Sequence, residues 1–202
     1  MKVITIGREF GSGGREFGKL LAEELGFDYY DDEILTAIAN KSGLAQSYVR
    51  SIVEQSSFEN YSASYGNTVF FSDLTSDNHL KIIQSQNDVL RELAQKSDSV
   101  FVGRCADVVL DKFDPLKIFV YADLETRLAR SKATAPENEH LSDKELLKKI
   151  REIEKKRTRY YRAFTERTWG AKENYHLCVN TSGKVIKDLV PSVAEFCRAW
   201  FK

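Results

Sequence analysis

The chain has 202 residues, of which 42% are hydrophobic and 30% charged, and its 30 basic residues balance its 30 acidic ones. This size predicts one globular domain with a buried core, and the neutral charge argues against a nucleic-acid polymer or an anionic membrane as partner. No apolar run approaches the roughly 20 residues that cross a bilayer, and the N-terminus has no signal-peptide pattern, so we expect a cytoplasmic protein.

The first predicted strand runs into a glycine-rich bend that opens into a helix. The β-branched apolar run 3–6 is followed by four glycines within residues 7–14, and the next apolar residues recur at helical spacing. Glycine permits backbone angles that let several N–H groups point into one concavity at the positive end of a helix. With Arg8 and Arg15 beside it, this loop predicts an anion site; the alternative is a tight turn that binds nothing.

The loop departs from the usual phosphate-binding motif G-x-x-x-x-G-K-[ST]. When Gly11, Ser12 and Gly13 are laid on the glycine-rich centre of that motif, Gly14 takes the position of the lysine. Arg15 follows it, and Glu16 stands where a small hydroxyl residue normally approaches magnesium.

The first helix is predicted to end near Gly26, and a short strand at 27–30 leads into Asp31 and Asp32. These aspartates either cap the next helix, expected over 33–40, or contact a ligand or metal-bound water. Another helix is expected after Ser42-Gly43, and the nearly uncharged segment 56–78 is expected to be a surface loop. Its aromatic residues either stack on a base or pack against the body: Tyr61, Tyr65, Phe70 and Phe71.

A long amphipathic helix is expected over 77–96, and the apolar run 99–102 then predicts a central strand of a parallel sheet. Ligands gather outside the carboxyl ends of such strands, so Arg104 is expected in the same crevice as the glycine-rich loop. The alternative is a salt bridge to one of the many carboxylates. Cys105 is expected to be a small filler, since no histidine is nearby in sequence to activate it.

The next strand is expected over 116–122, with Asp123 as the N-cap of a helix on which Arg127 and Arg130 share one face. After a polar break at 134–142, a very basic helix offers arginines either to phosphate or to solvent. A last strand at 175–180 precedes a helix at 185–200. This alternation predicts an α/β fold, a parallel sheet with helices on both faces. The histidines and cysteines lack metal-ligand spacing, so we expect no metal held by them and no disulfide framework.

Together these segments resemble the cytidylate kinase-like proteins, relatives of bacterial cytidylate kinase among the P-loop nucleoside monophosphate kinases. The resemblance covers nearly the whole chain and rests on ITIGREFGSGGREFGKLLAEELGFDYYDDEIL, VFVGRCADVVL, LKIFVYADLETRLAR, KKRTRYYRAFTERTWG and YHLCVNTS. It implies a three-layer P-loop NTPase fold in a single domain over 1–202, with a helical acceptor-binding insertion at about 32–98 and an arginine-rich lid at about 131–165. It also implies transfer of the γ-phosphoryl group from ATP, with Mg²⁺, to a nucleoside monophosphate such as CMP.

The resemblance assigns roles by position. The donor nucleotide is expected to contact Arg8, Gly11, Ser12, Gly13, Gly14, Arg15, Glu16, Thr181 and Ser182, with Arg15 in place of the missing lysine. The acceptor is expected to contact Asp31, Arg104, Cys105 and Asp107. The charge on the moving phosphoryl group is expected to be neutralised by Arg15, Arg104, Arg157, Arg159 and Arg162.

Three positions depart from the cytidylate kinase pattern. The loop lysine is absent, the aspartate of the G-R-D segment is Cys105, and Ala37 stands about where an acceptor-site arginine is expected. A thiol at 105 removes the simplest reason to expect CMP as acceptor. Two alternatives to the kinase therefore stay open: a nucleotide-binding sensor that has lost catalysis, and a scaffold or oligomeric module with a vestigial site. The sequence leaves the oligomeric state open, a homo-oligomer included.

Overall fold

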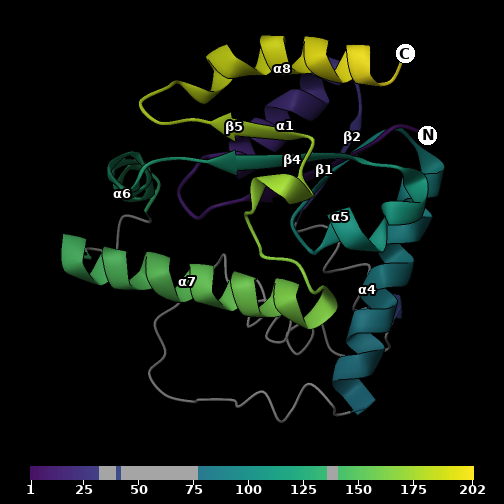
Figure 1. The fold of residues 1–202 in the computed structure, drawn as a ribbon, viewed down its shortest axis with the longest axis horizontal. Coiled ribbons are helices and arrows are strands. Elements are labelled where there is room, and N and C mark those ends of the chain that lie inside the picture. The colour runs from purple at the N-terminus through teal and green to yellow at the C-terminus, as the bar shows by residue number, and fades with distance from the viewer. Residues whose placement is uncertain (32–39, 42–76, 136–140) are drawn as a thin grey trace.

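The computed structural model describes residues 1–31, 40–41, 77–135 and 141–202. Its five strands form one parallel sheet in the order β2-β3-β1-β4-β5 (Figure 1). The strands are β1 (Val3–Arg8), β2 (Asp28–Tyr30), β3 (Ser99–Val102), β4 (Leu116–Tyr121) and β5 (Leu177–Asn180). The predicted α/β fold with a parallel sheet is confirmed.

One face of the sheet is covered by α1 (Gly14–Leu25) and α8 (Ile186–Trp200), seen above the strands in Figure 1. Because side chains alternate along a strand, Ile4 and Ile6 of β1 both point to this face. They share a buried cluster with Phe17 and Leu21 of α1 and Val190 of α8. Gly26 ends α1 in the left-handed conformation, at the residue where the sequence predicts the helix to stop.

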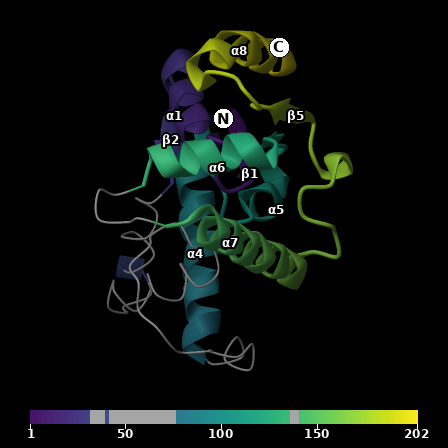
Figure 2. The same ribbon diagram turned by 90° about the vertical axis from the view of Figure 1, so that its left-hand side faces the viewer.

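The opposite face packs against α4 (Asp77–Lys96) and the short α5 (Ala106–Val109). Val3 and Phe101 form the strand side of a second buried cluster, with Leu90 of α4 and Leu110 after α5. Helix α7 (Asp143–Phe164) also lies on this side, so helices cover both faces as predicted (Figures 1 and 2).

Helix α6 (Leu124–Ala133) follows β4 and lies at the carboxyl edge of the sheet, in front of the strands in Figure 2. Asp123 is its N-cap, as predicted, with its Oδ1 accepting from Thr126 N at 2.7 Å. Helix α7 begins at a capping box made by Ser142 and Glu145. Both predicted arginine-bearing helices therefore begin where their sequences offer a cap.

The start of the last strand differs from the prediction. β5 begins at Leu177, two residues later than expected, because Lys172–Asn174 form a 3₁₀ turn and the Tyr175 ring packs 4.8 Å from the Phe119 ring. His176 is a satisfied histidine, as expected: its Nδ1 accepts from Lys117 N at 3.1 Å.

Several predicted features lie outside the described residues. They are Asp32, the helix at 33–40 up to residue 39, Ala37, the helix after Ser42-Gly43 and the aromatic residues of 56–76. Within the described ranges, none of the helices combines the length and apolar character that a bilayer crossing requires.

Candidate phosphate-binding site

The glycine-rich loop joins β1 to α1 at the carboxyl edge of the sheet, as the sequence predicts. Gly11 and Gly13 both have positive φ, 76° and 78°, which side chains with a Cβ disfavour. Gly13 is the N-cap of α1, and the first N–H groups of a helix have no acceptor within it. The loop therefore presents backbone donors at the positive end of a helix dipole, where an anion is stabilised.

Three consecutive loop carbonyls each accept a hydrogen bond from a side chain outside the loop. The bonds run from Arg127 Nε to Phe10 O (2.7 Å), from Arg130 Nη1 to Gly11 O (3.1 Å) and from Thr181 Oγ1 to Ser12 O (2.7 Å). In a trans peptide the C=O and the following N–H point in opposite directions, so these bonds also fix the direction of the next amides, of which that of Ser12 donates to Glu9 O at 3.4 Å.

These three hydrogen bonds to the loop were not predicted from the sequence. The signal was present, because the sequence placed Arg127 and Arg130 on one helical face, and both do reach the loop from α6. Thr181, expected to contact the donor nucleotide, is fully buried and donates from its Oγ1 to Ser12 O of the loop. Ser182 accepts from Asp123 N through its Oγ at 2.7 Å, so it contacts the start of α6.

A group of buried and partly buried charges connects α7 to the loop. Arg127 pairs with Glu9 of the loop at 3.3 Å and with Glu154 of α7 at 3.1 Å. Glu154 Oε1 also accepts from Phe10 N at 2.7 Å, so a carboxylate of α7 occupies one of the loop amides. Burial raises the pKa of the Glu154 carboxyl, against the opposing effects of this hydrogen bond and of two neighbouring arginines.

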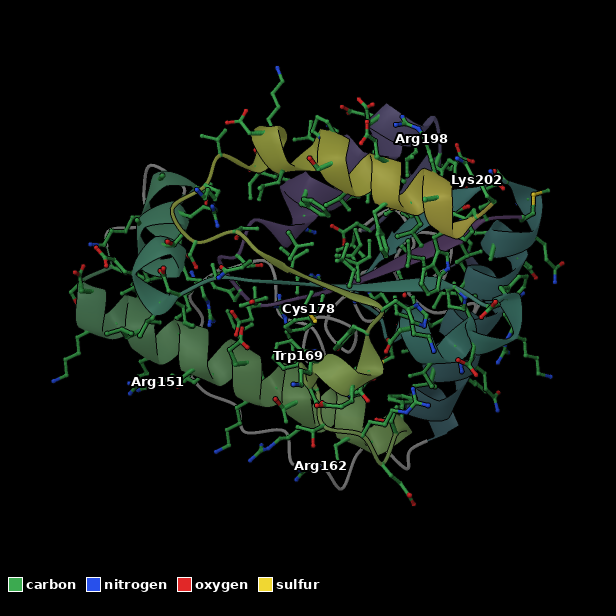
Figure 3. The ribbon with its side chains drawn as sticks, turned by 45° about the horizontal axis from the view of Figure 1, so that its top comes forward. Arg151, Arg162, Trp169, Cys178, Arg198 and Lys202 are labelled. Atoms are coloured by element: carbon green, nitrogen blue, oxygen red, sulfur yellow. The ribbon has the colours of Figure 1, made fainter. Side chains whose placement is uncertain are left out.

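Of the three predicted lid arginines, one reaches the loop. Arg157 is buried, and its Nη1 donates to Arg8 O at 2.8 Å. Arg159 and Arg162 are exposed, and Figure 3 shows Arg162 on the outer side of α7, away from the sheet. The signal for this difference is helical spacing: Arg157 lies four residues from both Ile153 and Tyr161, which are buried on the inner face of α7.

The turn after β3 has an unusual backbone. Gly103, Arg104 and Cys105 have φ values of 78°, 60° and 51°, three left-handed residues in a row. For the two residues that carry a Cβ this conformation costs about 1–2 kcal/mol each. Gln86 of α4 supports the turn, with its Nε2 donating to Arg104 O at 3.4 Å and to the Tyr160 hydroxyl at 3.0 Å. Strain of this kind concentrates at functional sites.

Cys105 behaves as the filler that the sequence predicts. Its side chain is buried, and burial raises the pKa of its thiol well above the usual value. A neutral, buried thiol is a poor nucleophile.

A cavity of about 40 Å³ lies between the ends of β1 and β3 and the inner face of α7. A space of this size holds two or three water molecules or a few ligand atoms. It brings together Arg8, Arg104 and Arg157 from three elements, with one carboxylate, Asp107. Its lining consists of Thr5, Ile6, Gly7, Arg8, Gly103, Arg104, Cys105, Asp107, Arg157, Tyr160, Tyr161, Trp169 and Tyr175. Arg104 lines this cavity with Gly7 and Arg8 at the start of the loop, whereas residues 11–14 of the loop are not among its lining residues.

Asp107 is buried, and the Tyr161 hydroxyl donates to its Oδ2 at 2.8 Å. Burial raises the pKa of the Asp107 carboxyl, although this hydrogen bond opposes the shift. When the pKa of a carboxyl is higher in the folded state than in the unfolded state, its protonation stabilises the fold. This stabilisation is complete below the unfolded pKa, about 3.9, and is lost as pH rises through the folded pKa.

Asp107→Asn should therefore raise the melting temperature at pH 7 relative to the wild type, by an amount that shrinks toward pH 4. Asp111→Asn is the matched control with the opposite sign, because a hydrogen bond from Lys117 lowers the pKa of Asp111. The Asp111→Asn variant should be less stable than the wild type at pH 7, and this difference should fade as pH falls. Melting temperatures recorded every half unit from pH 4 to 7.5 test both, and a pH-independent effect of Asp107→Asn contradicts this account.

Arg15 and Asp31, expected on the donor and acceptor sides, pair with each other. Arg15 Nε donates to Asp31 Oδ2 at 2.5 Å beside the Tyr29 hydroxyl, and the Arg15 side chain is 37% exposed. Glu16 is exposed on α1. Arg15 and Asp31 therefore meet at the end of β2, and none of the three residues is among those that line the cavity.

The described residues offer no magnesium site made of protein side chains alone. Among the described residues, no three histidine, cysteine, aspartate or glutamate side chains converge as metal ligands would. The acidic groups near the loop are engaged by other partners: Glu9 and Glu154 by Arg127, Asp31 by Arg15, and Asp107 by Tyr161. We therefore assign no ligand for Mg²⁺ and derive no step through it. The loop and its arginines do fit the phosphate groups of a nucleotide.

Comparison with known proteins agrees with this geometry. The sequence profile of the cytidylate kinase-like family matches residues 3–183, which confirms the resemblance predicted from the sequence. No curated protein matches the chain.

Solved structures share the fold. An uncharacterized protein from Eubacterium ventriosum is 24% identical with a TM-score of 0.68, over 98% of this chain and 99% of that one. A shikimate kinase from Bacteroides thetaiotaomicron is 14% identical with a TM-score of 0.58, over 98% of each chain. A shikimate kinase from Acinetobacter baumannii, in complex with shikimate, is 16% identical with a TM-score of 0.51, over 98% of this chain and 94% of that one. These likenesses confirm the P-loop NTPase fold.

Proposed function

The chain belongs to the cytidylate kinase-like family, and we propose that it transfers the γ-phosphoryl group of ATP to a small phosphorylated acceptor, a nucleoside monophosphate. The observation that carries this proposal is the cavity in which Arg8, Arg104 and Arg157 meet beside the glycine-rich loop. Three arginines and one aspartate line this mostly buried space. Such a space favours a bound phosphoryl group.

Phosphoryl transfer asks little covalent chemistry of the protein, because it depends on positioning and on neutralising charge. In our proposal the loop amides at 11–14 bind the donor phosphates, and Arg104 binds the phosphate of the acceptor. Arg157 reaches the same cavity from α7, so that helix contributes charge and also covers the site. Excluding water in this way favours transfer to the acceptor over hydrolysis.

We propose an acceptor other than CMP. Cys105 follows Arg104 in the turn after β3, where an aspartate would offer hydrogen-bond acceptors to a cytosine edge. A buried thiol with a raised pKa is a weak donor and a weak acceptor. The pyrimidine edge is therefore left without that contact, while the phosphate contacts do not depend on the base.

The second candidate is a nucleotide-binding sensor, and Glu154 favours it. Its carboxylate accepts from Phe10 N and pairs with Arg127, so α7 is held on the loop by a group that bears the same charge as a phosphate. A nucleotide entering the loop would compete with this carboxylate. Binding would then be coupled to the position of α7, with or without transfer.

The test is incubation with ATP and Mg²⁺ and one of CMP, dCMP, UMP, AMP or GMP, with ADP and the new diphosphate separated by chromatography. We expect a diphosphate from one acceptor. The KM for that acceptor should be at least about tenfold higher in Arg104→Ala, because the variant loses a charge-assisted hydrogen bond to the acceptor phosphate. Arg151→Ala, an exposed arginine on the outer side of α7, is the matched control and should behave as the wild type (Figure 3).

The outcomes separate the candidates. Product formation with an unchanged acceptor KM in Arg104→Ala contradicts the role of Arg104. No product, in a protein whose melting temperature rises with ATP, supports the sensor. No product and no stabilisation by any nucleotide supports a scaffold with a vestigial site.

A further inference from the structure

The outer face of helix α7 carries a row of basic side chains that the proposed function does not use. They recur along the helix at intervals of three or four residues, and all of them are exposed: Lys144, Lys148, Arg151, Lys155, Arg159 and Arg162. At 3.6 residues per turn this spacing keeps them within about a quarter of the helix circumference, over about 27 Å of its length. Figure 3 shows Arg151 and Arg162 on this side, pointing away from the sheet.

The opposite face of α7 fixes the direction of this row. Ile150 and Ile153 are buried on that face, and Glu154 accepts from Phe10 N of the glycine-rich loop and pairs with Arg127. A helix anchored in this way cannot turn its outer side chains toward the interior. The row is therefore presented to the surroundings of the protein along a straight helix.

The helix itself supplies little negative charge to this row, since it carries nine basic and four acidic residues. Three of the acidic residues have other partners: Asp143 pairs with Lys132, Glu145 closes the capping box, and Glu154 pairs with Arg127. The fourth, Glu152, is exposed at the edge of the row.

Arg159 takes part in another interaction, so the inference rests on the other five basic residues of the row. Within the part of the chain that the structure describes, none of those five makes an ion pair. Like charges that follow one another along a helix repel. A partner with a row of negative charges would relieve this repulsion and release the counterions that the two surfaces hold.

The chemistry of the row favours a phosphate backbone over a protein or a membrane. Protein interfaces are depleted in lysine and have apolar or aromatic side chains at their centre, and a helix that binds a membrane surface inserts an apolar face. Among the described residues, none of the large apolar side chains that are exposed lies on α7. No exposed aromatic ring of α7 offers a base a stacking partner either, which favours a duplex over a single strand.

We propose that the outer face of α7 binds the phosphate backbone of duplex DNA without reading its sequence. The major groove of B-form DNA admits an α-helix between two rows of phosphates, whereas the major groove of A-form RNA is too narrow. Lys144, Lys148 and Lys155 act as point charges on flexible stems, which suits contacts that do not depend on sequence. This surface is separate from the cavity, and its binding does not depend on phosphoryl transfer.

The balanced charge of the whole chain predicted no nucleic-acid partner. That prediction averages over all faces of the molecule, but the attraction of a polyanion depends on the charge of the face that meets it.

The test is the salt dependence of DNA binding, measured by fluorescence anisotropy with a fluorescein-labelled DNA duplex of about 20 base pairs between about 50 and 200 mM NaCl. Each neutralised phosphate contributes about −0.9 to the slope of log K against log salt concentration, so five cations predict a slope of about −4.5. The variant K148Q/R151Q/K155Q should have a slope of about −2 and bind at least about tenfold more weakly at the lowest salt concentration.

The variant K19Q/K187Q/K202Q is the matched control. It removes the same charge from exposed lysines of α1, of α8 and of the chain end beyond α8, away from α7. It should keep the slope and the affinity of the wild type. Both variants change exposed side chains only, so their melting temperatures should equal that of the wild type.

A wild type that does not bind the duplex at the lowest salt concentration overturns the proposal, and so does a slope that the α7 variant leaves unchanged. An equal loss in the control variant also overturns it, because the effect would then be one of net charge. Tighter binding to an RNA duplex of the same length, to poly-L-glutamate or to phosphatidylserine vesicles would assign the row to another polyanion and overturn the proposal for DNA. None of these results bears on the proposed phosphoryl transfer, which the nucleotide assay tests separately.

Discussion

Replacing Arg127 with alanine should lower the free energy of unfolding by about 3 kcal/mol, the loss typical when one partner of a buried ion pair is removed. The Arg127 side chain is 9% exposed and holds Glu9, Glu154 and the carbonyl of Phe10. Without it, two partly buried carboxylates have lost their shared cation. For a chain of this size the melting temperature should fall by roughly 6–12 °C, measured together with urea denaturation.

The same helix supplies the control. Lys132 of α6 pairs with Asp143, but the two side chains are 49% and 68% exposed. Water screens such a pair, so Lys132→Ala should cost no more than about 0.5 kcal/mol. Equal losses in the two variants would contradict the stabilising role of the buried Arg127 ion pairs. ATP affinity should also fall in Arg127→Ala alone, because the carbonyl of Phe10 is released.

Gly11→Ala should cost about 3 kcal/mol, since it combines strain at a positive φ with overpacking. The φ of Gly11 is 76°, and its added Cβ would lie 2.7 Å from both the Arg127 carbonyl oxygen and Ser131 Oγ. A backbone oxygen of α6 cannot yield without moving the helix. The loop would move instead, and its amides would leave the geometry that a phosphate needs.

Gly26→Ala measures the cost of a positive φ without the steric clash that an added Cβ causes at Gly11. Gly26 also has a positive φ, 69°, but an added Cβ would meet nothing within 4 Å. Its replacement should cost about 1–2 kcal/mol and leave ATP affinity unchanged. Chemical denaturation and ATP titration of both variants make the comparison. Equal stability losses, with ATP binding retained by Gly11→Ala, contradict the tight contact between the loop and α6.

Most of the fold was predictable because its signals are local. Apolar runs such as 99–102 mark strands buried on both faces, Gly26 marks a helix end, and Asp123 marks a helix start. The start of β5 was predicted wrongly because alternation alone does not distinguish a strand from a 3₁₀ turn that packs an aromatic ring. Tyr175 packs on Phe119, and this contact joins residues far apart in sequence.

The sequence by itself determined the glycine-rich loop, its place after the first strand, and the helix that follows. Those features depend on the backbone preferences of neighbouring residues. Only the tertiary structure decided which charges meet there. The strand order puts β1 beside β3, which brings Arg8 to the turn that carries Arg104. Arg157 lies on the buried face of α7 and Arg162 on its exposed face, because an amphipathic helix buries only one of its sides.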